Sequence, residues 1–115
     1  MAVSREYLDY ILDQLAGIPG LSSRAMFGGA GIYSDGRMFA LVTDDCLYLK
    51  ADTKNLPIFE AEGARPLTYR RSGKTVSLSY FLVPDEILED DVRLKDWAWL
   101  AISAARRKPV KREKS

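Results

Sequence analysis

The chain has 115 residues, of which 47% are apolar and 29% are charged, and its formal net charge is +1. These values indicate one soluble globular domain and exclude a largely disordered chain. No long apolar run suggests a signal peptide or a membrane span, so we expect a cytoplasmic protein. The chain has no histidine and a single cysteine, Cys46, so we expect no internal disulfide, no metal site, no cofactor and no enzyme activity.

The N-terminal segment predicts an amphipathic helix. Ser4 is a suitable N-cap, and Gly17 and Pro19 are suitable to end the helix. Between them, apolar residues recur at steps of three and four positions, namely Leu8, Ile11, Leu12 and Leu15.

Antiparallel strands are expected to follow as a meander. The first strand-like stretch runs through the glycines over residues 24–33. Asp35-Gly36 is a two-residue hairpin signal that leads into a strand over 37–42. A second turn at 43–45 leads into a strand over 46–50.

The next segment predicts a short helix and a second hairpin. Asp52 is a candidate cap for a helix that reaches Ala61, although Pro57 disfavours it. A hairpin follows, with strands at 67–71 and 76–82 around Ser72-Gly73. One face of its second strand is apolar and is expected to meet the helices, and this face comprises Val76, Leu78, Tyr80 and Leu82.

The most regular element is a helix over Asp91–Arg107, with acids before it and bases at its end. Its apolar stripe comprises Leu94, Trp97, Ala98, Ala101 and Ala105. The element order predicts an α+β fold, a two-layer sandwich in which the N- and C-terminal helices pack on one face of a largely antiparallel sheet of five to six strands. We expect a single domain over residues 1–108 and a flexible basic tail at 109–115.

The glycine cluster Gly28-Gly29-Ala30-Gly31 could be a phosphate-binding loop or a device of the sheet. It has neither the G-x-G-x-x-G nor the G-x-x-x-x-G-K-[ST] spacing. A strand rather than a helix follows it, so no helix N-terminus would face an anion. A bend, a bulge or close packing is favoured, and a ligand loop is the alternative.

Two groups of cations are candidate nucleic-acid contacts. The first is a sheet face with Arg24, Lys50, Arg70, Arg71 and Lys74, interleaved with Tyr33, Tyr48 and Tyr69. The second is the C-terminal segment 106–115, with six basic residues and one acid, including Arg106, Arg107, Lys108, Lys111 and Arg112. Scattered surface charge and a solvated terminus are the alternatives.

The terminal helix also carries a candidate interface. Val92 and Trp99 fall roughly opposite the apolar stripe, and Ile102 lies between the two faces. One helix cannot bury every side against one sheet. These residues therefore suggest a subunit or partner interface, and packing of Trp99 under a loop is the alternative.

Several segments together resemble the N-terminal domain of the TfoX/Sxy family, regulators of bacterial natural competence. They are residues 24–33, Asp35-Gly36, 39–42 and 47–50, and the likeness extends through Tyr69, Tyr80, Pro84 and the helix with Trp97. The residues that mark the motif are Met26, Phe27, Gly28, Gly29, Gly31, Tyr33 and Gly36.

The resemblance implies a compact α+β domain like that of secretion chaperones and a regulatory role without catalysis. Full-length family members have a second, C-terminal domain and work with the cyclic-AMP receptor protein at competence genes. We expect no counterpart of that second domain in this sequence, so the resemblance does not imply an output that requires it. We expect a module that acts by protein–protein contact in transcriptional regulation, with a homodimer as one form. A nucleic-acid-binding accessory protein that uses the basic tail and sheet cations is the alternative.

Overall fold

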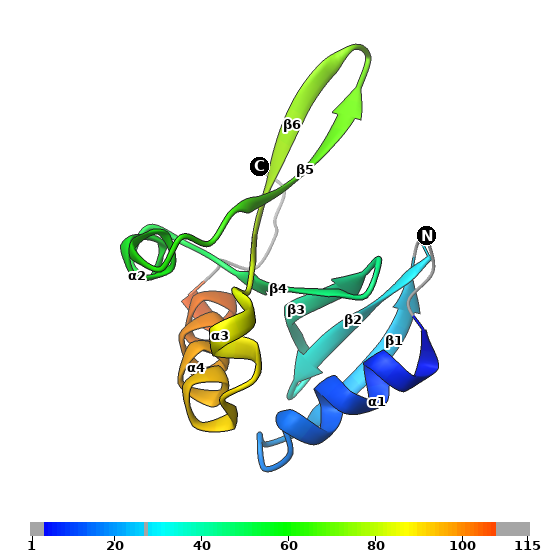
Figure 1. Ribbon diagram of the computed structural model, residues 1–115, viewed down its shortest axis with the longest axis vertical. Coiled ribbons are helices and arrows are strands. Elements are labelled where there is room, and N and C mark those ends of the chain that lie inside the picture. Colours follow the sequence, from blue (N-terminus) through cyan, green and yellow to red (C-terminus); the bar gives the residue numbers. More distant parts are fainter. Residues whose placement is uncertain (1–3, 27, 108–115) are drawn as a thin grey trace.

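A computed structural model describes residues 4–26 and 28–107, which form one antiparallel sheet with helices beside it (Figure 1). In chain order the elements are α1 (Arg5–Gln14), β1 (Leu21–Met26), β2 (Gly29–Ser34), β3 (Arg37–Thr43), β4 (Cys46–Lys50), α2 (Leu56–Ala61), β5 (Pro66–Arg71), β6 (Lys74–Leu82), α3 (Asp85–Leu88) and α4 (Asp91–Arg107).

The sheet has the strand order β1-β2-β3-β4-β6-β5, and every neighbouring pair is antiparallel. In Figure 1, α1, α3 and α4 lie on the lower side of the sheet, whereas the β5–β6 hairpin rises from its upper side. This arrangement confirms the predicted α+β fold and the packing of the first and last helices on one face.

The hydrophobic core lies between the sheet and these helices. Most of its fully buried residues come from α1 and the residue after it, from β2 to β4 and from α4, and α2 and α3 contribute one each; they include Ile11, Leu15, Ile32, Phe39, Val42, Leu47, Leu49, Phe59, Ile87, Leu94 and Ala101. The stripe predicted for the terminal helix is buried throughout. Burial of apolar side chains of this size contributes about 1.5–3 kcal/mol each, so this one interface dominates the stability of the domain.

The hairpin turns follow from local residue chemistry. Asp35-Gly36, Asp44-Asp45 and Ser72-Gly73 all have positive φ angles, between 51° and 81°. Two successive positive φ values are the geometry of the tight turn that matches the twist of antiparallel strands. The turns confirm three sequence predictions and fix which residues face each other across the sheet.

One strand prediction is wrong. Residues 24–33 do not form one stretch, because β1 ends at Met26 and β2 begins at Gly29, and these two residues pair across the two antiparallel strands. Gly28 has a φ of +79°, a conformation that glycine adopts without steric cost and that allows the chain to reverse here. Phe27 lies outside the described residues.

The predicted orientation of β6 is also wrong. Phe81 packs against the core, whereas Tyr80 and Leu82 pair with Lys50 and Tyr48 on the opposite side of the sheet. Leu78 on the same strand is 37% exposed. The more apolar face of β6 therefore points away from the helices, and the side chain of Val76 is outside the described part.

The short helix α2 is confirmed. Asp52 accepts hydrogen bonds from the backbone N–H groups of Lys54 and Asn55 and so shapes the turn that precedes the helix. Pro57 lies in the first turn of the helix, where a backbone N–H group has no helical partner, so the lack of this group in proline does no harm. The buried Asn55 side chain donates to the carbonyls of Lys50 and Leu100 and thereby ties this turn to β4 and α4.

Candidate functional site

The side of the sheet that faces away from the helices carries a continuous group of large side chains. Cross-strand pairs place Gly31 beside Leu41, Leu41 beside Tyr48, and Tyr48 beside Leu82, so that these residues share this side. We call this surface the open face, and its described residues include Arg24, Met26, Tyr33, Met38, Leu41, Tyr48, Lys50, Tyr80 and Leu82. Apart from the exposed Arg24, these side chains are half-buried.

Two cations of the open face lie over tyrosine rings. The Arg24 guanidinium carbon is 5.8 Å from the centre of the Tyr33 ring, and Lys50 Nζ is 5.3 Å from the centre of the Tyr80 ring. Both distances are within the range of cation–π attraction. The aliphatic stems of the cations add to the apolar surface.

Two tyrosines of the open face, Tyr48 and Tyr80, remain protonated at neutral pH because their surroundings raise the pKa of each phenol. Burial, with a smaller contribution from Tyr33, raises the pKa of Tyr80 to about 12. Burial also raises the pKa of Tyr48, and the neighbouring Cys46 and Asp44 add to the shift. A neutral phenol can donate a hydrogen bond while its ring contributes apolar contact area, which is a combination suited to recognition.

Gly31 creates room on the open face. A Cβ atom at this position would lie 2.6 Å from Sδ of Met38 and 3.0 Å from Sδ of Met26. The missing side chain therefore lets two flexible thioethers pack over the strand. The glycine motif thus shapes this surface through close packing, as the favoured sequence interpretation predicts.

The predicted interface on the terminal helix is partly wrong. Ile102 is 2% exposed and belongs to the core, because α4 contacts α1 and α3 as well as β3 and β4 and is covered on more than one side. Val92 and Trp99 are 66% and 41% exposed. Their role as an interface stays a prediction.

The candidate nucleic-acid contacts of the hairpin and the C-terminal segment divide into four groups. Arg107 is not a free contact, because its guanidinium donates to Asp52 at 2.7 Å and 2.9 Å. Arg106 lies 3.9 Å from Asp35 in an exposed ion pair. Arg70 and Lys74 are exposed near the end of the β5–β6 hairpin. The side chains of Tyr69 and Arg71, and the residues Lys108, Lys111 and Arg112, lie outside the described part.

A pocket of about 410 Å³ lies where α1, the start of β4 and the start of α3 meet, and its lining includes Tyr7, Asp45, Cys46 and Asp85. Burial and the nearby aspartates raise the pKa of the Cys46 thiol. Burial chiefly raises the pKa of Tyr7 to about 12. Both groups are thereby held in their protonated forms, which are poor nucleophiles and bases.

The open face was only partly predicted from the sequence. The sequence predicts a sheet face with Arg24, Tyr33, Tyr48 and Lys50, but gives no sign that Met38, Leu41 and Leu82 join it. The apolar stripe of β6 was assigned to the core instead. The hairpin turns could have shown that Leu41 belongs to this face, because they set the strand register that pairs Leu41 with Tyr48.

Comparison with known proteins gives the family. The sequence profile of the TfoX N-terminal domain matches residues 13–105, and the chain belongs to this family. Protein Sxy of Escherichia coli (strain K12) is 27% identical over 93 residues, which are 81% of this chain and 44% of the relative. The DNA transformation protein TfoX1 of Aliivibrio fischeri (strain ATCC 700601 / ES114) is 31% identical over 64 residues, which are 56% of this chain and 31% of the relative.

The match covers less than half of the length of each of these two relatives. Within residues 4–26 and 28–107, no helix is long and apolar enough to cross a membrane. In the same part of the chain, no group of three or more His, Cys, Asp or Glu side chains is gathered in a way that could hold a metal ion.

Proposed function

We propose that this chain is a regulatory module of the cytoplasm that acts in transcription by binding a protein partner through the open face. The observation that carries the proposal is the group of tyrosine, methionine and leucine side chains on the uncovered side of the sheet. Aromatic residues, methionine and arginine are enriched at protein interfaces relative to the rest of protein surfaces. Family membership supports a regulatory role without catalysis.

The open face favours a protein over single-stranded nucleic acid. Bases bind to sheets by stacking on free aromatic rings, with several cations along the backbone path. Here the cations Arg24 and Lys50 already lie over the rings of Tyr33 and Tyr80. An apolar partner surface with hydrogen-bond acceptors for the phenols fits this face better.

The proposal is tested by complementation in the native host. A strain that lacks the protein is supplied with the wild type, with Met38→Glu/Leu41→Glu, or with Val92→Glu, which tests the rival interface on α4, and transcripts are measured across the genome. Both open-face positions are half-buried, so a carboxylate there would be desolvated by a docked partner. Thermal unfolding of each purified variant verifies that it folds.

We expect the wild type and Val92→Glu to restore the transcripts that the deletion changes, and the open-face variant to fail. Restoration by a folded open-face variant would show that this surface is not the contact. A deletion that changes no transcripts under any growth condition tried would reject the regulatory role itself.

A further inference from the structure

The β5–β6 hairpin extends beyond the rest of the sheet as a two-stranded arm. β6 pairs with β4 through Tyr80, Phe81 and Leu82, the Ser79 carbonyl accepts a hydrogen bond from the Ala51 N–H, and the part of β6 before Ser79 pairs only with β5. We call residues 65–79 the arm, and Figure 1 shows it rising away from the helices. A two-stranded ribbon is narrow, since neighbouring strands lie about 4.8 Å apart.

The arm contains charges of one sign only. Four charged residues lie between Gly63 and Pro84, and all are basic, namely Arg65, Arg70, Arg71 and Lys74. The described side chains among them are exposed. The Nη2 atom of Arg70 donates to the carbonyl of Gly73 at 3.1 Å, which holds this guanidinium beside the turn that Lys74 follows.

Exposed hydroxyl groups accompany these cations. Thr75 lies opposite Arg70 in the ladder, so the two residues share one side of the ribbon. Thr68, Ser72 and Ser79 are also exposed. Basic and hydroxyl side chains together are the groups that proteins use to contact phosphate oxygens in nucleic acids.

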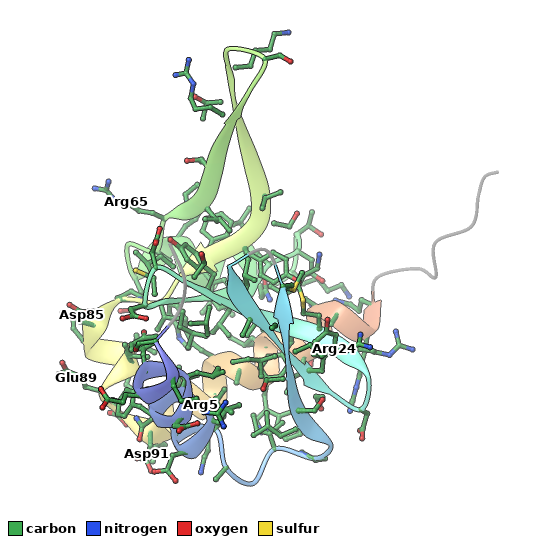
Figure 2. All side chains as sticks on the ribbon, turned by 90° about the vertical axis from the view of Figure 1, so that its right-hand side faces the viewer. Arg5, Arg24, Arg65, Asp85, Glu89 and Asp91 are labelled. Atoms are coloured by element: carbon green, nitrogen blue, oxygen red, sulfur yellow. The ribbon has the colours of Figure 1, made fainter. Side chains whose placement is uncertain are left out.

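The acidic residues before the terminal helix lie away from the arm, and Asp52, which lines a pocket with Pro66 and Ser79 of the arm, is already paired with Arg107. All five charged residues between positions 85 and 91 are acids. Figure 2 shows Arg65 at the base of the arm, whereas Asp85, Glu89 and Asp91 lie on the part of the molecule remote from the arm tip. The arm therefore keeps a positive potential although the chain is nearly neutral overall.

We infer that the arm binds the phosphate backbone of double-stranded DNA, with Arg70 and Lys74 as its principal contacts. A two-stranded ribbon fits the major groove of B-form DNA, which is about 12 Å wide. The negative charge of DNA also complements the arm, which has basic residues and no carboxylates. This second surface is separate from the open face and does not depend on the protein partner proposed for it.

The test measures the binding of the 115-residue chain to a fluorescent DNA duplex of about 20 base pairs by anisotropy, at several salt concentrations from about 50 to 200 mM. The arm variant is Arg70→Gln/Lys74→Gln. The matched control is Arg5→Gln/Arg93→Gln, which removes the same charge from exposed positions outside the arm. A third variant replaces Lys108, Lys111 and Arg112 by glutamine.

We expect micromolar binding by the wild type at the lowest salt, weaker by about tenfold or more in the arm variant and within about twofold in the control. The slope of log affinity against log salt should fall by about two in the arm variant, one for each lost phosphate contact. Thermal unfolding should be unchanged, because both side chains are exposed.

Four results would overturn the inference. One is an absence of duplex binding at the lowest salt. Another is an equal loss in the arm variant and the control, and a third is a loss confined to the variant of the C-terminal segment. The last is arm-dependent binding to vesicles of equal parts phosphatidylserine and phosphatidylcholine with none to DNA, which would assign the arm to a membrane surface.

Discussion

Gly29 and Gly31 lie two positions apart on β2 and leave no room for a side chain, but for different reasons. At Gly29, a Cβ atom would collide with the backbone carbonyl oxygen of Val42 on the neighbouring strand. At Gly31, the closest atoms are the thioether sulfurs of Met38 and Met26. A backbone atom in a sheet cannot yield, whereas a methionine side chain can rotate away.

We therefore predict that Gly29→Ala lowers the free energy of unfolding by about 1–3 kcal/mol and that Gly31→Ala lowers it by less than about 1 kcal/mol. Urea denaturation of the two variants measures both values. Equal costs at the two positions would contradict the distinction between a backbone collision and a side-chain collision.

Asp52 joins the end of α4 to the turn before α2. Its carboxylate accepts two hydrogen bonds from Arg107 and two from backbone N–H groups, although the side chain is still 25% exposed. These bonds, above all those from Arg107, lower the pKa of Asp52 from its usual 3.8 to about 2. Because solvent screens a partly exposed pair, the gain in stability is modest.

The lowered pKa sets the sign of a pH dependence. The ionised form is favoured in the folded state, so the stabilisation is present above the usual pKa of 3.8 and is lost as the pH falls through about 2. Asp52→Asn keeps an oxygen for the backbone N–H groups and removes the charge. We predict an unfolding temperature a few degrees below that of the wild type at neutral pH, and a difference that vanishes as the pH falls to about 2.

Thermal unfolding followed by circular dichroism, from neutral pH down to about pH 2, measures the difference in unfolding temperature between Asp52→Asn and the wild type. Asp9→Asn is the control, because Asp9 forms a more exposed pair with Arg5 and should show little change. A deficit of Asp52→Asn that persists at the lowest pH would show that charge is not its cause.

At the scale of the element, α4 carries two tryptophans with opposite environments. Trp97 is 6% exposed, and the centre of its ring lies 4.6 Å from that of Phe59 in α2. Trp99, two positions later, points toward the other side of the helix and is 41% exposed. A separation of two positions on α4 therefore places one tryptophan in the core and the other at the surface.

We predict that Trp97→Ala lowers the free energy of unfolding by about 3–5 kcal/mol, because it leaves a large cavity beside Phe59. Trp99→Ala should cost about 1 kcal/mol or less. Guanidinium denaturation compares the free energies of unfolding of these two variants.

Light scattering of Trp99→Glu examines the interface prediction, since an unchanged assembly state in a folded variant would reject a subunit contact at Trp99.

Most individual elements were predictable because their signals are local. The helix periodicity of α4 and the Asp35-Gly36 turn depend on residues close together in the chain. The face of β6 was not predictable, because its orientation follows from pairing with β4, whose residues lie thirty or more positions earlier in the chain. The Asp52–Arg107 pair joins residues 55 positions apart and has no local sequence signature.

At the scale of the whole molecule, the fold separates three surfaces. Helices cover one side of the sheet, the open face occupies the other, and the arm projects beyond both (Figure 1). Sequence reasoning identified the fold and several open-face residues. It did not find the complete face, because a stripe of apolar residues in one strand does not reveal which side of a sheet the helices cover.

The proposed role of the open face is tested most directly by photo-cross-linking in the native host. A benzophenone amino acid is placed at Leu41 on the open face or at Val92 on α4, and cross-linked products are identified by mass spectrometry. We predict a specific protein partner from position 41, none from position 92, and loss of the product when Met38→Glu is added. A partner cross-linked from position 92 and none from position 41 would contradict the account and assign the contact to α4.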